Sequence, residues 1–524
     1  MGTFLEDKDR NVIPRLRSFR TTLALGELNS AIAVEDCFSS QEEKHSLLSK
    51  IVAWKKSRTI SFAADLVSAA FVFQEPEEAR EAAESILAKG SEAPKASRTI
   101  AERLLESLST PSRQVRSLPE LILPEPDDIR ARIGTIRKRL GDEPRNAILW
   151  VELSRAFALL GLEAKAGRAM DIAVDLAPTN RFVLRSASRL YIHLGRHGKA
   201  HSVLERAKST KYDPWLLSAE IAASSAADRR SRLIGTGQKM LKDQSIAPFQ
   251  KNELASAIAT LELSNGKVQS ARSLFRQALQ NPNENSVAQA EWALRRKHMD
   301  SVEVDLDRVR DVTPRSFEAR AWVHFMTKEW KPAFLASFDW LKDQPFSIRP
   351  VLFGSYIAAS LLDDYSDCQR IIKIGLRANP DEPMLLNNLA FACASAGDID
   401  EAERYFRKID LSKTKDATDK IAITATQGLL LFRRGHASAG RSFYQLAIEE
   451  ARKISLDRAS AMASIYLARE EILSGSKWAD NAMRFATEEY QRTSDPDIKE
   501  ILRRVQDLNE RTAKKKTISG NSTR

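Results

Sequence analysis

The amino-acid sequence predicts an all-α protein in which helical hairpins stack one on another into a solenoid. The first observation behind this prediction is a recurrence of proline about every 34 residues. Proline lacks an N–H and its ring clashes with the preceding turn, so it ends one helix pair and is tolerated only in the first turn of the next. The prolines that mark the repeat are Pro144, Pro178, Pro214, Pro248, Pro282, Pro314, Pro345 and Pro380.

Composition is the second observation. The 524 residues are 43% hydrophobic and 29% charged, which is typical of folded rather than disordered chains. The only cysteines, Cys37, Cys368 and Cys393, are too scattered for a disulfide framework or a metal knuckle. We expect them to be small core residues in a reducing compartment.

The residue types inside one period are the third observation. Trp150, Leu153 and Phe157 recur at helical spacing, and the small residues Ala166 and Ala173 follow on a second helix before the next proline. This arrangement resembles the tetratricopeptide repeat (TPR) superfamily, whose consensus places a large residue, a small residue and a closing proline in the same order. The resemblance implies a right-handed TPR-like superhelical solenoid. Small residues let two helices approach to about 8–10 Å while the large ones fill the space around them.

The resemblance covers residues 126–510, where we expect roughly nine to eleven helical hairpins. The pattern is clear at 184–207, 258–282, 386–406 and 424–447 and weakest at 283–345. A final helix pair at 457–490 and a polar helix to about residue 510 complete the stack.

Residues 1–125 are helical in pattern but do not follow the period, so we expect a separate N-terminal helical region, which diverged repeats could form. Ser40 and Glu43 form a capping box that begins the first of its helices. A proline-rich linker then places the boundary near residue 125. The expected helices cover 40–55, 60–73, 76–89 and 96–109.

Residues 511–524 form a basic tail with too little apolar content to fold, so we predict disorder there. The net charge of the chain is +11, and this tail contributes five of the positive charges and no acid. The body is therefore only mildly basic. A basic stripe with interleaved aromatic residues is lacking, which makes nucleic acid an unfavourable partner.

No catalytic or metal-binding pattern stands out. His193, His197 and His201 have helical ligand spacing, but Gly195 and Gly198 place a turn among them, so we expect them to point apart. The sequence also lacks the usual hydrolase, metalloprotease and kinase motifs. We therefore predict no enzyme activity, no catalytic residues, no metal and no cofactor.

The N-terminal residues are charged where a signal peptide would be apolar, and no uncharged apolar run reaches the roughly 18 residues that span a bilayer. We expect a cytoplasmic protein that does not associate with membranes.

The resemblance implies that the first helix of each unit lines a concave surface. Its register places Arg155 on one unit and Arg185, Arg189 and His193 on the next. Guanidinium groups bind carboxylates bidentately, so we hypothesise a cationic patch that binds an acidic segment of a protein partner. The alternative is a solvated face whose charge is neutralised by nearby acids such as Glu152 and Glu163.

The same register gives a second concave surface late in the chain. Asparagine can hydrogen-bond an extended backbone and phenylalanine can offer apolar pockets, so this surface is interpreted as a peptide groove. The alternative is that its phenylalanines belong to the core. The residues are Asn387, Asn388, Phe391, Leu429, Phe432 and Arg433.

These patterns predict a non-catalytic scaffold or adaptor that binds a protein or peptide partner in the concave groove, because a one-dimensional stack creates an extended surface without an enclosed active site. Three alternatives remain open: a regulator of an enzyme encoded nearby, a nucleic-acid-associated protein that uses the groove arginines, and an enzyme that uses residues 1–125. The partner, the pathway and the oligomeric state are open.

Overall fold

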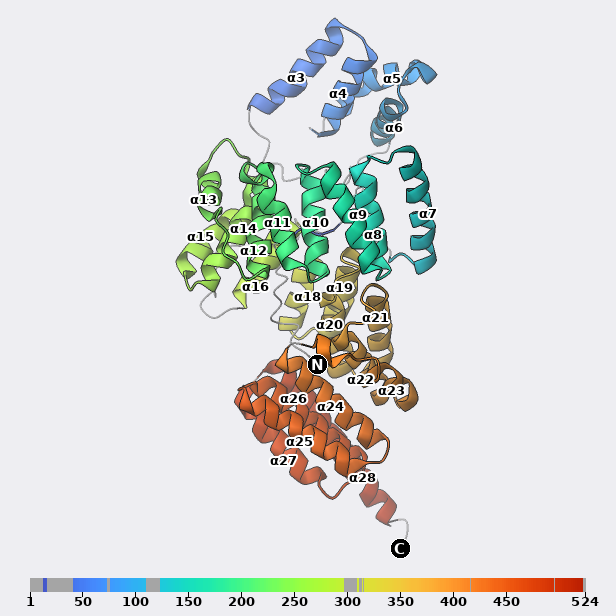
Figure 1. Ribbon diagram of the computed structural model, residues 1–524, viewed down its shortest axis with the longest axis vertical. Coiled ribbons are helices and arrows are strands. Elements are labelled where there is room, and N and C mark those ends of the chain that lie inside the picture. The colour runs from blue at the N-terminus through green and yellow to red at the C-terminus, as the bar shows by residue number, and fades with distance from the viewer. Residues whose placement is uncertain are drawn as a thin grey trace.

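The computed structural model describes residues 13–16, 41–72, 76–109, 123–295, 309–310, 313, 315–414, 416–493 and 495–521. Helices joined by short turns account for most of these residues, and no strand occurs among them. Figure 1 shows the helices stacked side by side along one long axis. The predicted all-α solenoid of helical hairpins is confirmed.

The first described helices form a bundle with its own hydrophobic core. That core includes Trp54, Leu66, Ile86 and Leu104 and contains only residues that precede the solenoid. Figure 1 shows this bundle at one end of the molecule. The helices are α3 (Gln41–Lys56), α4 (Ile60–Val72), α5 (Arg80–Ala88), which a 3-10 turn (Pro76–Ala79) precedes, and α6 (Lys95–Ser109).

The solenoid begins at Pro126, the first residue of α7 (Pro126–Asp142). From there the helices pair as antiparallel hairpins. The pairs are α8 (Ala147–Leu159) with α9 (Glu163–Leu176), α10 (Arg181–His193) with α11 (His197–Arg206), α12 (Pro214–Ala226) with α13 (Ile234–Lys242), α14 (Pro248–Ser264) with α15 (Val268–Ala278), α18 (Phe317–Met326) with α19 (Trp330–Asp343), α20 (Arg349–Tyr356) with α21 (Tyr365–Ala378), α22 (Pro383–Ala396) with α23 (Ile399–Phe406), α24 (Ala417–Arg433) with α25 (Ala437–Lys453), and α26 (Asp457–Leu473) with α27 (Ala479–Thr493). Helix α16 (Glu284–Leu294) stands between the α14–α15 and α18–α19 hairpins, and α28 (Pro496–Asn521) ends the chain.

The periodic prolines within the described residues lie in the first turns of helices or in the turns between them, and Pro314 lies outside those residues. Pro214 and Pro248 occupy the first turn of α12 and α14, where a missing N–H costs no hydrogen bond. Pro144 and Pro178 lie in the turns between hairpins. The following helix is then capped by a side chain, as when Asn146 Oδ1 accepts from the N–H groups of Ile148 and Leu149.

Small residues bring the paired helices close together, as the TPR resemblance implies. Ala166 is fully buried, and Ser154 Oγ donates to its carbonyl oxygen at 2.8 Å across the α8–α9 hairpin. In the α24–α25 hairpin, a Cβ built on Gly440 would lie 2.8 Å from the carbonyl oxygen of Gly428. A side chain on either glycine would separate these backbones.

The superhelix curves until the turn between its sixth and seventh hairpins, α20–α21 and α22–α23, meets its first hairpin. A Cβ on Gly161, in the α8–α9 turn, would lie 2.8 Å from Pro380 Cδ in the α21–α22 turn. Arg377 Nη2 lies 3.0 Å from Glu125 Oε2. Phe346 also packs into the core of the first hairpins. These contacts close the concave side of the N-terminal half against a later part of the same chain.

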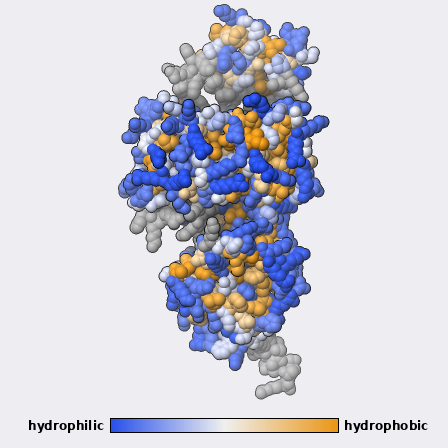
Figure 2. Space-filling view, in the orientation of Figure 1, coloured by the Kyte–Doolittle hydropathy of each residue, from blue (hydrophilic) through white to orange (hydrophobic). Residues whose placement is uncertain are grey.

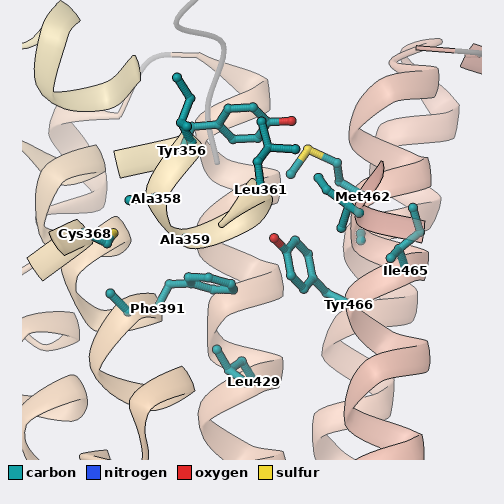
Figure 3. Close-up of a cluster of buried hydrophobic side chains, with 14 of the residues drawn as sticks. Tyr356, Ala358, Ala359, Leu361, Cys368, Phe391, Leu429, Met462, Ile465 and Tyr466 are labelled. Atoms are coloured by element: carbon teal, nitrogen blue, oxygen red, sulfur yellow. The ribbon is translucent and has the colours of Figure 1, made fainter. Parts of the chain in front are cut away.

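The C-terminal half is closed in a similar way by its last helix. After Tyr356, α20 continues as a π turn (Ile357–Leu361), and α28 packs against this turn. Arg458 Nη2 donates to the Tyr356 hydroxyl at 3.0 Å and also bonds Asp497 of α28. One hydrophobic core fills the space between these helices, and Figure 3 shows part of it.

The described part of the chain end is helical as far as Asn521. Helix α28 continues past Arg511 to Asn521, where disorder is predicted. No proline interrupts this stretch, and Thr512 Oγ1 donates back to the carbonyl oxygen of Leu508, as in a continuous helix. Among residues 496–513, whose side chains the structure describes, the buried ones precede Arg511; they are Ile498, Ile501, Leu502 and Val505, with Asp497 beside them.

Because the anchoring side chains of α28 precede residue 511, we expect a chain that ends at Glu510 to have an unchanged melting temperature. Circular dichroism melts of the intact and shortened proteins measure this. A drop of several degrees on shortening would show that residues 511–524 dock on the solenoid.

Candidate functional site

The N-terminal concave groove is lined by the first helices of consecutive units, as the register predicts. Helices α8, α10, α12, α14 and α16 each contact the next in this series. Arg155 comes from α8, and Arg185, Arg189 and His193 come from α10. The inward direction of these predicted side chains agrees with the structure.

A short segment of the same chain occupies this groove. Ile13 is 4% exposed and Leu16 is 2% exposed, and both belong to the core that the first hairpins form. Arg155 Nε donates to the carbonyl oxygen of Leu16 at 3.3 Å. Burial lowers the pKa of Arg155 to about 10. The guanidinium therefore lies beneath the segment and not on an open surface.

Arg15 anchors the segment through its charge. Its Nε lies 2.7 Å from Asp343 Oδ2 at the end of α19, and its Nη1 donates to Asn285 Oδ1 at 3.0 Å. Glu284 Oε2 lies 3.8 Å from the same nitrogen. Two of the guanidinium nitrogens are thus held by oxygens from two different parts of the solenoid.

Arg185 supports this anchor indirectly. Its Nη2 pairs with Glu253 of α14 at 2.8 Å. Glu253 Oε1 also accepts from the side-chain amides of Asn283, at 2.8 Å, and Asn285, at 3.1 Å. Because the amide nitrogen of Asn285 is used in this way, its oxygen is the atom that faces Arg15.

Arg189 and His193 contact an aromatic ring that a later hairpin supplies. The Arg189 guanidinium lies over Phe346, 5.7 Å from its centroid, and the His193 ring packs edge-on against it at 5.1 Å. Arg189 is only 5% exposed. The turn after α19 therefore forms a further wall of the groove.

These positions change the interpretation of the predicted cationic patch. Arg155 is covered by Leu16, Arg185 is paired with Glu253, and Arg189 is buried. The groove presents acids as well as arginines, and beside Arg15 it retains a cavity of about 300 Å³. Phe182, Trp215 and Glu253 are among the residues that line this cavity.

The late concave surface is not an open groove, and the prediction that it exposes amides and apolar side chains is wrong. Asn387 and Asn388 are each 1% exposed, and Asn388 Nδ2 donates to Ser355 Oγ at 3.3 Å. Phe391 faces inward as its register predicts but packs against Tyr466 of α26 at 5.2 Å, as Figure 3 shows. The hydroxyl of Tyr466 reaches Ser360 at 2.8 Å.

The remaining residues of that surface also have internal partners. Leu429 is fully buried, and Phe432 packs between α24 and α25 against Gly440 and Tyr444. Arg433 Nε pairs with Glu470 at 2.8 Å. The alternative that the phenylalanines belong to the core is confirmed, because both lie in one buried cluster, Phe391 against Tyr466 of α26 and Phe432 between α24 and α25.

The three histidines are separated, as predicted. His193 ends α10 and His197 begins α11, while His201 Nε2 lies 3.2 Å from Glu220 Oε1. Burial raises the pKa of Glu220, and Ser231 Oγ donates to the other oxygen of this carboxyl. Ser231 thus bonds the acid and not the imidazole, which is not the arrangement of an activated nucleophile. Within the described ranges, no group of histidine, cysteine and acidic residues is arranged to hold a metal ion.

Sequence reasoning missed the residues that define the groove: Arg15, Glu253, Asn285 and Asp343. One local signal was present, because Ile13, Pro14 and Leu16 form an apolar stretch within a charged N-terminal sequence. The acids lie on helices that reach the groove only after the superhelix has turned, so their spacing in the sequence carries no such signal.

No family model and no curated protein matches the chain. Solved structures do match at low identity. Yeast Tom70 is 14% identical over 88% of this chain and 96% of its own, with a TM-score of 0.32. A human IFIT1 dimer with PPP-AAAA is 15% identical over 74% and 96%, with a TM-score of 0.36. The APC/C hetero-tetramer Cut9–Hcn1 is 13% identical over 90% and 94%, with a TM-score of 0.41. The fold is therefore assigned from the helices and cores of the chain itself.

The helices also bear on membrane association. Among the residues that the structure describes, none of the helices combines the length and the apolar character that crossing a bilayer requires. Figure 2 shows polar and charged residues over much of the visible face, with apolar residues gathered in patches between them.

Proposed function

We propose that this chain is a non-catalytic protein-interaction scaffold that holds an unstructured segment of a partner in the groove lined by α8, α10, α12, α14 and α16. The observation that carries the proposal is the groove's present occupant. Residues 13–16 lie in it without helix or strand structure, and their apolar side chains are buried there.

The groove has what such a site needs. Ile13 precedes a proline, which disfavours the helical region and keeps the segment open for hydrogen bonding. The groove supplies a donor to the Leu16 carbonyl oxygen from Arg155 and polar anchors from α16 and α19. Burying one side chain such as Leu16 contributes about 1.5–3 kcal/mol. A partner segment that makes similar contacts would gain similar stabilisation.

The acidic-segment hypothesis and the three alternative functions fit this geometry less well. An acidic segment would meet Glu253, Glu284 and Asp343, and the arginines that would attract it are already paired or buried. The same pairing removes the exposed guanidinium ladder that a nucleic acid would use. Regulation of an enzyme remains compatible with the proposal, since the enzyme would then be the partner.

Site-specific photo-cross-linking tests the proposal without disturbing the groove charges. Benzoylphenylalanine replaces Phe182, an aromatic residue that lines the groove cavity, and in a control protein it replaces Tyr212, which is 81% exposed outside the groove. Cross-linking is carried out in the native cell and the products are identified by mass. We expect a partner protein to be captured from position 182 and not from position 212. Equal capture at both positions would show that the partner binds elsewhere.

A further inference from the structure

We propose that the groove recognises a partner segment in which an arginine is followed by a leucine and preceded by an apolar residue, and that residues 13–16 compete with this segment from within the same chain. The proposal rests on the proposed function and specifies the chemistry of the partner. Its evidence is the set of contacts that Ile13, Arg15 and Leu16 make.

The arginine contacts require a guanidinium. Asp343 Oδ2 forms an ion pair with Nε at 2.7 Å, and Asn285 Oδ1 accepts a hydrogen bond from Nη1, so two nitrogens of one planar group are contacted from two directions. A lysine ammonium is a single point of charge on a flexible stem and cannot place donors at both atoms. The acceptors are themselves positioned, because the Arg185–Glu253 pair orients the amide of Asn285.

The apolar contacts fix the register of the segment around the arginine. Leu16 follows Arg15 directly and Ile13 lies two residues before it, and both are buried in the core of the first hairpins. The backbone carbonyl of Leu16 is held by Arg155. A segment with a polar residue at the position of Ile13 or of Leu16 would bury that residue in an apolar environment, which is unfavourable.

Competition follows from the covalent connection. Residues 13–16 belong to the same chain as the groove, so they bind as a tethered ligand whose effective concentration is set by the chain between them and α8. A partner segment must therefore displace them. Weakening the internal segment should increase the affinity for an added segment of the same chemistry.

The test uses a fluorescent synthetic peptide with the sequence of residues 9–20 as the probe. Its binding to the full chain is measured by fluorescence anisotropy, with the wild-type protein and the Arg15→Ala variant compared. We expect the peptide to bind the variant at least tenfold more tightly than the wild type. Circular dichroism establishes that the variant is folded, and Leu16→Ala serves as a second variant with the same expected direction.

Peptide and groove controls separate recognition from general charge attraction. Peptides carrying Arg15→Lys or Arg15→Ala keep the other arginines of the probe. They should bind the Arg15→Ala protein at least tenfold more weakly than the unaltered peptide does. Adding Asp343→Asn to that protein should weaken the binding of the unaltered peptide to a similar degree. Adding Asp142→Asn, at an exposed acid on α7, should leave the affinity for this peptide unchanged.

Several results would overturn the proposal. The first is equal affinity of the unaltered peptide for the wild-type and Arg15→Ala proteins, and the second is equal affinity of the three peptides. A wild-type dimer that becomes a monomer on Arg15→Ala, seen by light scattering, would mean that a second copy supplies the segment. If position 182 still captures a partner while the peptide fails to bind, the proposed function stands and only this inference fails.

Discussion

Replacing Gly440 with alanine is expected to lower the free energy of unfolding by about 3 kcal/mol, because no space exists for the added methyl group. A Cβ at this position would lie 2.6 Å from Phe432 Cδ2, 2.8 Å from the carbonyl oxygen of Gly428 and 3.0 Å from the backbone nitrogen of Phe432. Two of these atoms belong to the backbone of α24, which can move only if the α24–α25 hairpin separates. Urea unfolding followed by circular dichroism measures the effect.

Gly134 provides the matched control. It also lies inside a helix, α7, but a Cβ there would meet nothing within 4 Å. Gly134→Ala should therefore raise the free energy of unfolding by about 0.5–1 kcal/mol through helix propensity alone. If Gly440→Ala raised the free energy of unfolding as Gly134→Ala is expected to, the close approach of α24 and α25 would be refuted.

Replacing Arg458 with alanine is the second change with a large expected effect. This guanidinium joins three helices: its Nη2 bonds Tyr356 of α20 at 3.0 Å, and it pairs with Asp497 of α28 and, at 2.8 Å, with Asp495. Asp497 is buried, so removing Arg458 would leave the Asp497 carboxylate as an uncompensated buried charge. Breaking such a pair costs about 3–5 kcal/mol.

The pH dependence of the stability lost in Arg458→Ala identifies the Asp497 carboxylate as the cause of that loss. Burial alone would raise the pKa of Asp497, but the hydrogen bond and charge of Arg458 outweigh it and hold the pKa below its ordinary value of 3.8. A carboxyl with a lowered folded pKa stabilises the protein above its ordinary pKa, and this stabilisation is lost as the pH falls through the folded value. The cost of Arg458→Ala should therefore be largest near neutral pH and shrink in strong acid.

Arg434→Ala is the control for this change. Arg434 also bonds two carboxylates, those of Asp400 and Glu403, but it lies on the surface, where solvent screens the pairs. The Arg434→Ala substitution should therefore destabilise the protein far less than Arg458→Ala at every pH. Equal losses for the two variants would mean that the contact between α20, α26 and α28 does not close the C-terminal half.

The local elements of this fold were predictable because their causes are local. Pro214 and Pro248 begin helices since proline is tolerated in a first turn, and the prediction of helices at 60–73 and 96–109 agrees with α4 and α6 to within a residue or two. The prediction of disorder after residue 511 rests on low apolar content, which excludes packing but not the continuation of an existing helix as far as Asn521.

The candidate site was predictable only in part, for a physical reason. Register showed that Arg155, Arg189 and Phe391 point inward, since the helical period fixes direction. Whether the inner face is open depends on curvature, which accumulates over many units. Tyr466 covers Phe391, and Phe346 covers Arg189, from hairpins that no local pattern relates to them.

The seating of residues 13–16 in the groove is the central claim, and a double-mutant cycle between Arg15 and Asp343 tests it most directly. The free energies of unfolding of the wild type, Arg15→Ala, Asp343→Asn and the double variant are measured in urea. Other interactions of Asp343 cancel in the cycle, so the coupling reports the contact between the segment and α19. We expect a coupling of at least about 1 kcal/mol, because the pair is buried and charge-assisted. Additive effects within about 0.5 kcal/mol would contradict the claim and leave the groove without its occupant.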